Sequence, residues 1–263
     1  MPIALTIAGS DPGGGAGIQA DLKTFHQFGV FGTTAIVALT AQNTLGVTGI
    51  HPVPVDFVRA QLEALAADLP PRALKTGMLA TKGLVEAVAG FIARHQWRDH
   101  VLDPVMVSTS GHRLLDADAE AAVRRLLLPL AAVVTPNLDE AEILVGHSVR
   151  EPAAMERAGA ELLALGARAA LLKGGHLDGA TIVDILVTPT GTVRYERPRL
   201  ATTSIHGTGC TLSAAITAGL AHGRPLEQSV AEALDVVARA IAAAPGLGSG
   251  HGPLNHFVDA PTP

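Results

Sequence analysis

The sequence predicts an α/β fold, in which a mainly parallel central sheet is flanked by helices on both faces and carries a small β-hairpin. Short apolar runs alternate along the chain with longer segments whose apolar residues recur at helical spacing. Hydrophobic residues make up 48% of the 263 residues, which is enough for a sizeable buried core. Because no linker, low-complexity tract or internal repeat interrupts this alternation, we expect one domain over residues 1–263.

In the first half of the chain, residues 3–8 form an apolar run that ends at Gly9 and predict a strand followed by a loop. Apolar side chains at helical spacing predict helices over residues 17–28 and 55–69, and Pro70 stops the second of these. The same criteria predict strands over residues 33–39, 73–76 and 101–102 and a helix over residues 81–94.

The second half continues the alternation. Helices are predicted over residues 116–128, 137–145, 152–165, 208–221 and 226–243, and strands over residues 131–134 and 169–172. Residues 181–187 and 192–196 flank a Pro-Thr-Gly turn and predict the hairpin. Parallel strands of this kind bind ligands beyond their carboxyl ends. Polar and glycine residues follow the predicted strands at positions 9–11, 75–77, 103–104, 135–137 and 173–175, so we expect a site there.

Composition and charge exclude several functions. The chain has 19 Lys and Arg residues against 24 Asp and Glu residues, and a net charge of −5 argues against a nucleic-acid binder. Aromatic residues are 3% of the chain, too few for stacking on single strands. The lone cysteine, Cys210, excludes an intrachain disulfide and zinc sites built on several cysteines. Since neither an export signal nor a long apolar run is found, we expect a cytoplasmic protein.

Residues 206–215 (HGTGCTLSAA) open a predicted helix with glycines. The free N–H groups of a first helical turn can hold an anion, and glycines let phosphate oxygens approach the backbone. The same position tends to lower the pKa of Cys210 and to give it thiolate character. A plain helix entry with a small buried thiol explains the segment equally well.

Three further segments carry candidate ligand-binding residues. The glycine-dense loop at residues 9–17 is a partial dinucleotide fingerprint, although a plain turn is the alternative. Asn137 and Glu140 lie on one helical face and suit Mg²⁺ beside a phosphate, but an N-cap with first-turn acids explains them too. Lys173, beside two glycines, either neutralises a phosphate or is a surface lysine. His251 and His256 are isolated histidines, which are more often not metal ligands.

Taken together, these segments resemble the hydroxymethylpyrimidine and phosphomethylpyrimidine kinases of thiamine biosynthesis, within the ribokinase-like superfamily. The resemblance covers nearly the whole chain. It is carried by residues 4–11 (ALTIAGSD), 14–23 (GGAGIQADLK), 41–44 (AQNT), 75–79 (KTGML), 103–107 (DPVMV), 135–137 (TPN), 173–176 (KGGH) and 206–211 (HGTGCT). It implies two successive phosphorylations of 4-amino-5-hydroxymethyl-2-methylpyrimidine, first to the monophosphate and then to the diphosphate. It also implies ATP and Mg²⁺ as cofactors, and a homodimer.

The resemblance also implies roles for particular residues. Gln42 is expected to contact the pyrimidine through its amide, and Cys210 occupies the position at which most of the superfamily has an aspartate base. The expected sites are Gly9, Asp21, Gln42, Met78 and Val105 for the substrate, Asn137, Lys173 and His206 for the nucleotide, Asp103 and Glu140 for the metal, and Gly207, Thr208, Gly209 and Cys210 for catalysis. Backbone N–H groups of the last segment would hold the transferring phosphoryl group. Cys210 would accept the hydroxyl proton in the first step only, because the second acceptor is already an anion.

Related proteins often carry Lys and Asp where this chain has Thr109 and His112, in an expected flap over the active site. The substitution removes a phosphate contact and changes the local charge. A pyridoxal kinase is the nearest alternative function, although the Gln42 amide, with a donor and an acceptor, favours an aminopyrimidine edge. A non-catalytic sensor of pyrimidines or nucleotides is more distant, because the candidate phosphate-binding residues argue against it.

Overall fold

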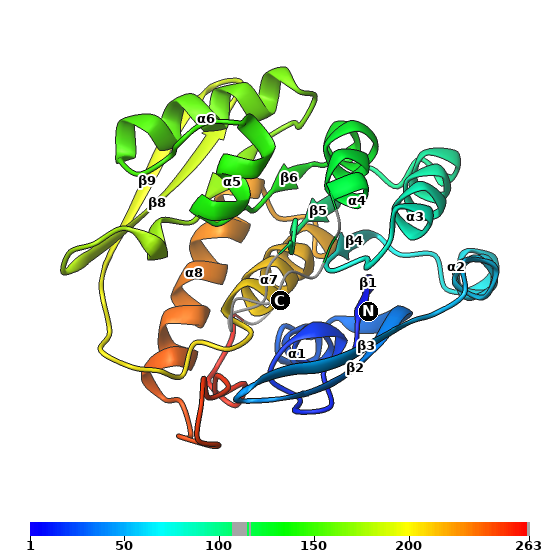
Figure 1. The fold of residues 1–263 in the computed structure, drawn as a ribbon, viewed down its shortest axis with the longest axis horizontal. Coiled ribbons are helices and arrows are strands. Elements are labelled where there is room, and N and C mark those ends of the chain that lie inside the picture. Colours follow the sequence, from blue (N-terminus) through cyan, green and yellow to red (C-terminus); the bar gives the residue numbers. More distant parts are fainter. Residues whose placement is uncertain (107–114, 116, 262–263) are drawn as a thin grey trace.

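A computed structural model describes residues 1–106, 115 and 117–261 of the protein (Figure 1). Within these residues, nine strands form one sheet in the order β3-β2-β1-β4-β5-β6-β7-β8-β9. The strands are β1 (Ile3–Gly9), β2 (Phe31–Asn43), β3 (Gly46–Pro52), β4 (Ala73–Thr76), β5 (His100–Leu102), β6 (Val133–Val134), β7 (Ala170–Leu172), β8 (Thr181–Thr188) and β9 (Gly191–Pro198). The strands from β2 to β7 in this order run parallel, and β3, β8 and β9 are antiparallel additions at the edges. The predicted fold class is confirmed, and so is the hairpin of β8 and β9.

Helices cover both faces of the sheet (Figure 1). They are α1 (Gly17–Gln27), α2 (Val55–Asp68), α3 (Lys82–His95), α4 (Ala117–Ala122), α5 (Leu138–Val145), α6 (Pro152–Ala164), α7 (Thr208–Ala221) and α8 (Leu226–Ala242). Alternate residues of a strand point to opposite faces. Leu5 and Ile7 therefore join the core shared with α2 to α6, whereas Ala4 joins the core shared with α1, α7 and α8.

Helix α7 lies in the middle of its layer and is buried along most of its length. Its inner positions are small, among them Ala214 and Ala218, so the helix packs closely against its neighbours. A Cβ atom on Gly219 would come within 2.5 Å of Ser229 Oγ in α8, so glycine is needed for this approach. The tight packing fixes the N-terminus of α7, which carries the glycine-rich segment, relative to the sheet.

Two elements differ from the sequence prediction. Strand β3 was not predicted, because most of its residues are partly or fully exposed and only Val47 is buried. The helix predicted over residues 116–128 is broken: α4 passes into a π-helical turn (Val123–Leu127) and a 3₁₀ turn (Leu128–Leu130). Pro129 lacks an N–H group, which explains the end of regular helix there. No helix in the described part of the chain has the length and apolar character needed to cross a membrane.

The strand order reverses at β1, which has β2 on one side and β4 on the other. Such a reversal leaves a crevice beyond the carboxyl ends of the two diverging strands, and ligands of open α/β sheets bind in that crevice. In this protein the crevice is bordered by the loop after β1, by the end of β4 and by the N-terminus of α7.

Candidate active site

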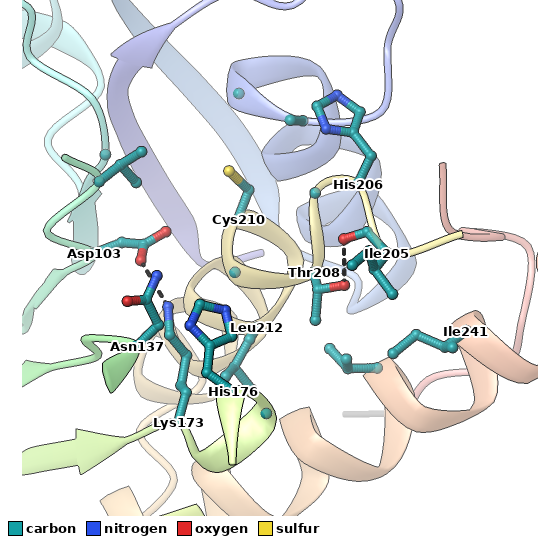
Figure 2. A pocket seen from close by; sticks show the side chains of 18 of the residues that line it. Asp103, Asn137, Lys173, His176, Ile205, His206, Thr208, Cys210, Leu212 and Ile241 are labelled. Carbon is teal, nitrogen blue, oxygen red and sulfur yellow. Dashed lines mark hydrogen bonds and ion pairs between the residues drawn. The ribbon is translucent and has the colours of Figure 1, made fainter. Parts of the chain in front are cut away.

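A cavity of about 720 Å³ lies over the carboxyl ends of the parallel strands. Of the residues expected from the sequence to form the site, it brings together Gly9, Gln42, Met78, Asp103, Val105, Asn137, Glu140, Lys173, His206, Gly207, Thr208, Gly209 and Cys210. Asp21 is the exception, because it does not line the cavity. Thr109 and His112 lie outside the described residues. Figure 2 shows Cys210 near the centre, with Lys173 and Asp103 on one side and His206 on the other.

Lys75, at the end of β4, borders the floor of the cavity and is fully buried. Its Nζ atom lies 2.9 Å from Asp21 Oδ1 and 3.9 Å from Asp103 Oδ2. Burial opposes the charged form, but the negative charges of Asp21 and Asp103, with the hydrogen bond to Asp21, outweigh burial and raise the pKa of Lys75 above its usual value. The structure therefore places a permanent positive charge beneath the site, which sequence reasoning did not find.

The placement of Asp21 corrects the expectation of direct substrate contact. Asp21 is fully buried in α1, and its second oxygen, Oδ2, accepts a hydrogen bond of 2.6 Å from Thr6 Oγ1. With Lys75 on the other oxygen, both carboxylate oxygens are already bonded. Asp21 acts on the site through Lys75.

Asp103, directly after β5, connects the two lysines of the site. Its Oδ1 atom lies 3.4 Å from Lys173 Nζ, as Figure 2 shows, and 3.4 Å from Thr135 Oγ1. Its Oδ2 atom accepts a 3.1 Å hydrogen bond from Ser213 Oγ and faces Lys75. Since the side chain is 1% exposed, the charges act here with little screening by water.

Asn137 and Glu140 form a capping box at the start of α5. Glu140 N–H donates to Asn137 Oδ1 at 2.9 Å, and Asn137 N–H donates to Glu140 Oε2 at 2.8 Å. Glu140 Oε2 also lies 3.9 Å from Lys173 Nζ. Burial raises the pKa of Glu140 to about 7, although Lys173 acts in the opposite direction. The N-cap interpretation of these residues is thus correct, and the cap also faces the cavity.

The start of α7 packs closely against the loop after β1 and leaves backbone N–H groups unused by the helix. Gly207 has a φ of 83°, and a Cβ atom there would lie 1.8 Å from the Gly15 carbonyl oxygen. The first bond of this turn runs from Thr211 N–H to the Gly207 carbonyl, so the helix does not use the N–H groups of Gly209 and Cys210. A Cβ atom on Gly209 would lie 3.3 Å from Lys173 Nζ, so glycine leaves room for the lysine.

The thiol of Cys210 departs from the expected chemistry. Burial raises its pKa to about 12; Lys75 acts in the opposite direction, whereas Asp21 and Asp103 add to the increase. The thiol is therefore protonated at neutral pH in the unliganded protein. The expected thiolate character is corrected, because the surrounding carboxylates and burial dominate over the helix N-terminus.

The two ends of the cavity differ in character. At one end, Gln42 Nε2 lies 3.3 Å from His206 Nε2, so the structure places His206 beside the expected pyrimidine contact and not with the expected nucleotide residues. Elsewhere, Val237 and Ile241 of α8 line the cavity as an aliphatic wall, of which Figure 2 shows Ile241. The sequence assigned no role to several polar residues that line the cavity, among them Asp11, Thr40, Lys75, Asp184, Arg197 and Arg199. Their signals are weak in the sequence because their partners, such as Asp184 for Arg197, are brought close only by the fold.

The fold, with a cavity at the switch point of an α/β sheet, is that of small-molecule kinases of the ribokinase-like fold. The family model described as phosphomethylpyrimidine kinase matches residues 11–255. The chain therefore belongs to the phosphomethylpyrimidine kinase family.

Individual relatives agree with this assignment. The hydroxymethylpyrimidine/phosphomethylpyrimidine kinase of Rhizobium meliloti is 49% identical over 97% of both chains. The thiamine biosynthesis bifunctional protein ThiED of Geobacter sulfurreducens is 47% identical over 97% of this chain, which spans about half (52%) of that relative. The crystal structure of a phosphomethylpyrimidine kinase from Clostridium difficile has a TM-score of 0.83 at 41% identity and covers 92% of this chain and 100% of its own. An ADP complex of Bacillus subtilis pyridoxal kinase has a TM-score of 0.90 at 37% identity over 97% of both chains.

Proposed function

We propose that the protein transfers the γ-phosphoryl group of ATP to the hydroxymethyl group of 4-amino-5-hydroxymethyl-2-methylpyrimidine, and then a second phosphoryl group to the monophosphate. The observation that carries this proposal is the order of groups along one cavity. Gln42 lies beside His206, with 3.3 Å between their Nε2 atoms. Figure 2 shows Cys210 between His206 on one side and Lys173 on the other. A single sheet supports both ends, which also favours one domain.

Phosphoryl transfer depends mainly on positioning and on electrostatic stabilisation. The N–H groups of Gly209 and Cys210 are free to bind the transferring group. Lys173 and Lys75 approach this point from two sides of Asp103 and would offset negative charge that develops on the phosphates. Asp103 holds the two cations in the cavity when no phosphate is bound.

Magnesium is part of the proposal. Among the residues that the structure describes, no three His, Cys, Asp or Glu side chains cluster as a metal site. Asp103 and Glu140 are nevertheless two buried carboxylates that both face Lys173. This donor set fits Mg²⁺, which usually takes one or two carboxylates and fills its other positions with phosphates and water. Asp103 and Glu140 would hold the ion, which supplies further neutralisation of phosphate charge.

Cys210 can act as the base of the first step only in its thiolate form. A base must be deprotonated, and burial raises the pKa of this thiol to about 12. The rate of the first phosphorylation should then rise about tenfold per pH unit above neutrality, because each unit increases the thiolate fraction tenfold. The second phosphorylation should lack this dependence. Equal pH profiles for both steps would refute the role of Cys210 as the base of the first step.

The main test is an ATP-dependent assay that resolves the products of hydroxymethylpyrimidine, its monophosphate and pyridoxal. Cys210→Ala should slow the first phosphorylation by about 10²-fold or more and leave the second within a few-fold. Cys210→Ser, which replaces the thiol by a hydroxyl of similar size, is the control for the volume lost in Cys210→Ala. Equal losses in both steps would exclude a proton-transfer role for the thiol.

A pyridoxal kinase is the second candidate, favoured by the overall likeness to the Bacillus subtilis enzyme. The Gln42 amide favours a pyrimidine as the substrate, because its donor and acceptor match a ring nitrogen and the adjacent amino group. A kcat/KM for pyridoxal far above that for hydroxymethylpyrimidine would overturn this choice.

We further propose a homodimer in the cytoplasm. The family resemblance supports the dimer, and the single free thiol, Cys210, supports a reducing compartment. Sedimentation at micromolar concentration tests the dimer, and fractionation of cells tests the compartment.

A further inference from the structure

The loop after β1 closes around the carboxylate of Asp11, which is 2% exposed. Its Oδ1 atom accepts the N–H group of Gly13 at 2.8 Å, and its Oδ2 atom accepts those of Gly15 at 3.0 Å and Ala16 at 2.9 Å. His206 Nε2 lies 2.9 Å from the same Oδ2 atom. Burial raises the pKa of Asp11, but the hydrogen bonds outweigh burial and hold the pKa below its usual value. An ionised carboxylate only accepts, so His206 Nε2 carries a hydrogen that points at Asp11.

This assignment constrains the amide of Gln42, which can sit in two orientations related by a half-turn. In one, Gln42 Nε2 faces His206 Nε2 at 3.3 Å, and Gln42 Oε1 faces Thr40 Oγ1 at 3.2 Å. Two donors then face each other at His206. At Thr40, the single hydroxyl hydrogen is already used in a 2.8 Å bond to the Ser10 carbonyl.

The other orientation satisfies every group. Gln42 Oε1 then faces the N–H of His206 as a second, longer acceptor, and Gln42 N–H donates to Thr40 Oγ1. The His206 ring cannot turn away to separate the two facing donors of the first orientation, because it is 12% exposed and packs against the loop backbone. A Cβ atom on Gly15 would lie 2.6 Å from the ring, and the backbone N–H of His206 donates to the Gly252 carbonyl at 3.1 Å and anchors the residue.

We propose that Asp11, through His206, and Thr40 are positioning residues that fix the Gln42 amide with its oxygen toward His206 and its nitrogen toward Thr40. This inference rests on the proposed function. The fixed amide would accept from the 4-amino group of the pyrimidine on the His206 side and donate to the ring nitrogen on the Thr40 side. Because the hydroxymethyl carbon is attached next to the amino-bearing carbon, this orientation turns the reacting group toward the segment that follows His206, which contains Cys210.

The test compares hydroxymethylpyrimidine with the analogue that lacks the 4-amino group, 5-hydroxymethyl-2-methylpyrimidine. In the wild type, kcat/KM should strongly favour the amino compound, because the analogue removes the second donor to the amide oxygen and leaves only the longer contact with His206. Thr40→Val and His206→Phe should reduce this preference about tenfold, mainly through KM, while KM for ATP stays unchanged. Thr40→Ser keeps the hydroxyl and should keep the preference.

The outcomes separate the inference from the function on which it rests. A preference that stays the same in Thr40→Val, even as both substrates slow together, indicates a merely structural role and overturns the inference alone. A wild-type protein that does not phosphorylate hydroxymethylpyrimidine overturns the proposed function and the inference with it. Circular dichroism of each variant checks folding, and the Thr40→Val and Thr40→Ser pair decides the matter if His206→Phe does not fold.

Discussion

Replacing Lys75 with methionine should destabilise the fold by several kcal/mol. Lys75 and Asp21 are both fully buried, and their charged atoms lie 2.9 Å apart. Methionine keeps much of the length of the side chain but leaves the Asp21 carboxylate with Thr6 as its remaining hydrogen-bond partner. Removing one partner of a buried ion pair costs about 3–5 kcal/mol, since the other charge stays buried without compensation.

Urea denaturation followed by circular dichroism measures this loss. Lys82→Met is the matched control, because Lys82 makes a 4.0 Å pair with Glu86 in which both side chains are about half exposed. Exposed pairs of this kind contribute about 0.2–1 kcal/mol. The double variant Lys75→Met with Asp21→Leu should recover much of the loss, because neither charge of this pair then remains buried. A loss for Lys75→Met no larger than that for Lys82→Met would refute a buried, charged pair.

The remaining predictions concern a glycine and a histidine. Gly207→Ala should lower the free energy of unfolding by about 1–3 kcal/mol and also lower kcat, because the φ of 83° and the Gly15 carbonyl both oppose a side chain. The control Gly90→Ala, in open space on α3, should instead stabilise the fold slightly. Equal effects of the two variants in urea denaturation would contradict this reasoning. Burial lowers the pKa of His100 from 6.5 to about 4, so the unfolded chain binds a proton before the folded protein does, and stability falls as the pH drops through this interval. The wild type should lose about 3 kcal/mol more than His100→Gln between pH 6.5 and 4, and parallel pH curves would exclude this titration.

The sequence was sufficient for most elements because their signals are local. The helix at residues 208–221 was predicted with the bounds of α7, since an apolar run follows its glycines directly. Strand β3 could not be predicted, because an exposed edge strand needs no apolar alternation and is specified by its pairing with β2. Elements that tertiary contacts create therefore leave little local trace.

The residues of the site likewise divide into those with a local sequence signal and those whose role depends on distant partners. Lys173 and the turn before Cys210 could be located because they follow a strand or open a helix, where ligands of this fold bind. Gln42, which lies within β2, was assigned from the family resemblance. The ion pair of Lys75 with Asp21 joins residues 54 positions apart, and nothing local distinguishes a buried lysine from an exposed one. The pKa of Cys210 was misjudged for the same reason, because burial and distant carboxylates decide it.

The contact between Gly207 and the Gly15 carbonyl has a consequence for how this chain can diverge. The two loops touch so closely that a single added carbon at position 207 has no room, whatever its chemistry. Substitution at position 207 becomes acceptable only if the loop of residues 9–17 shifts as well. Loops nearly two hundred residues apart are thus held at one fixed spacing. Under the proposed function this spacing separates the acceptor from the phosphoryl group, so new acceptor specificities should arise by changes at Gln42 and its neighbours within an unchanged frame.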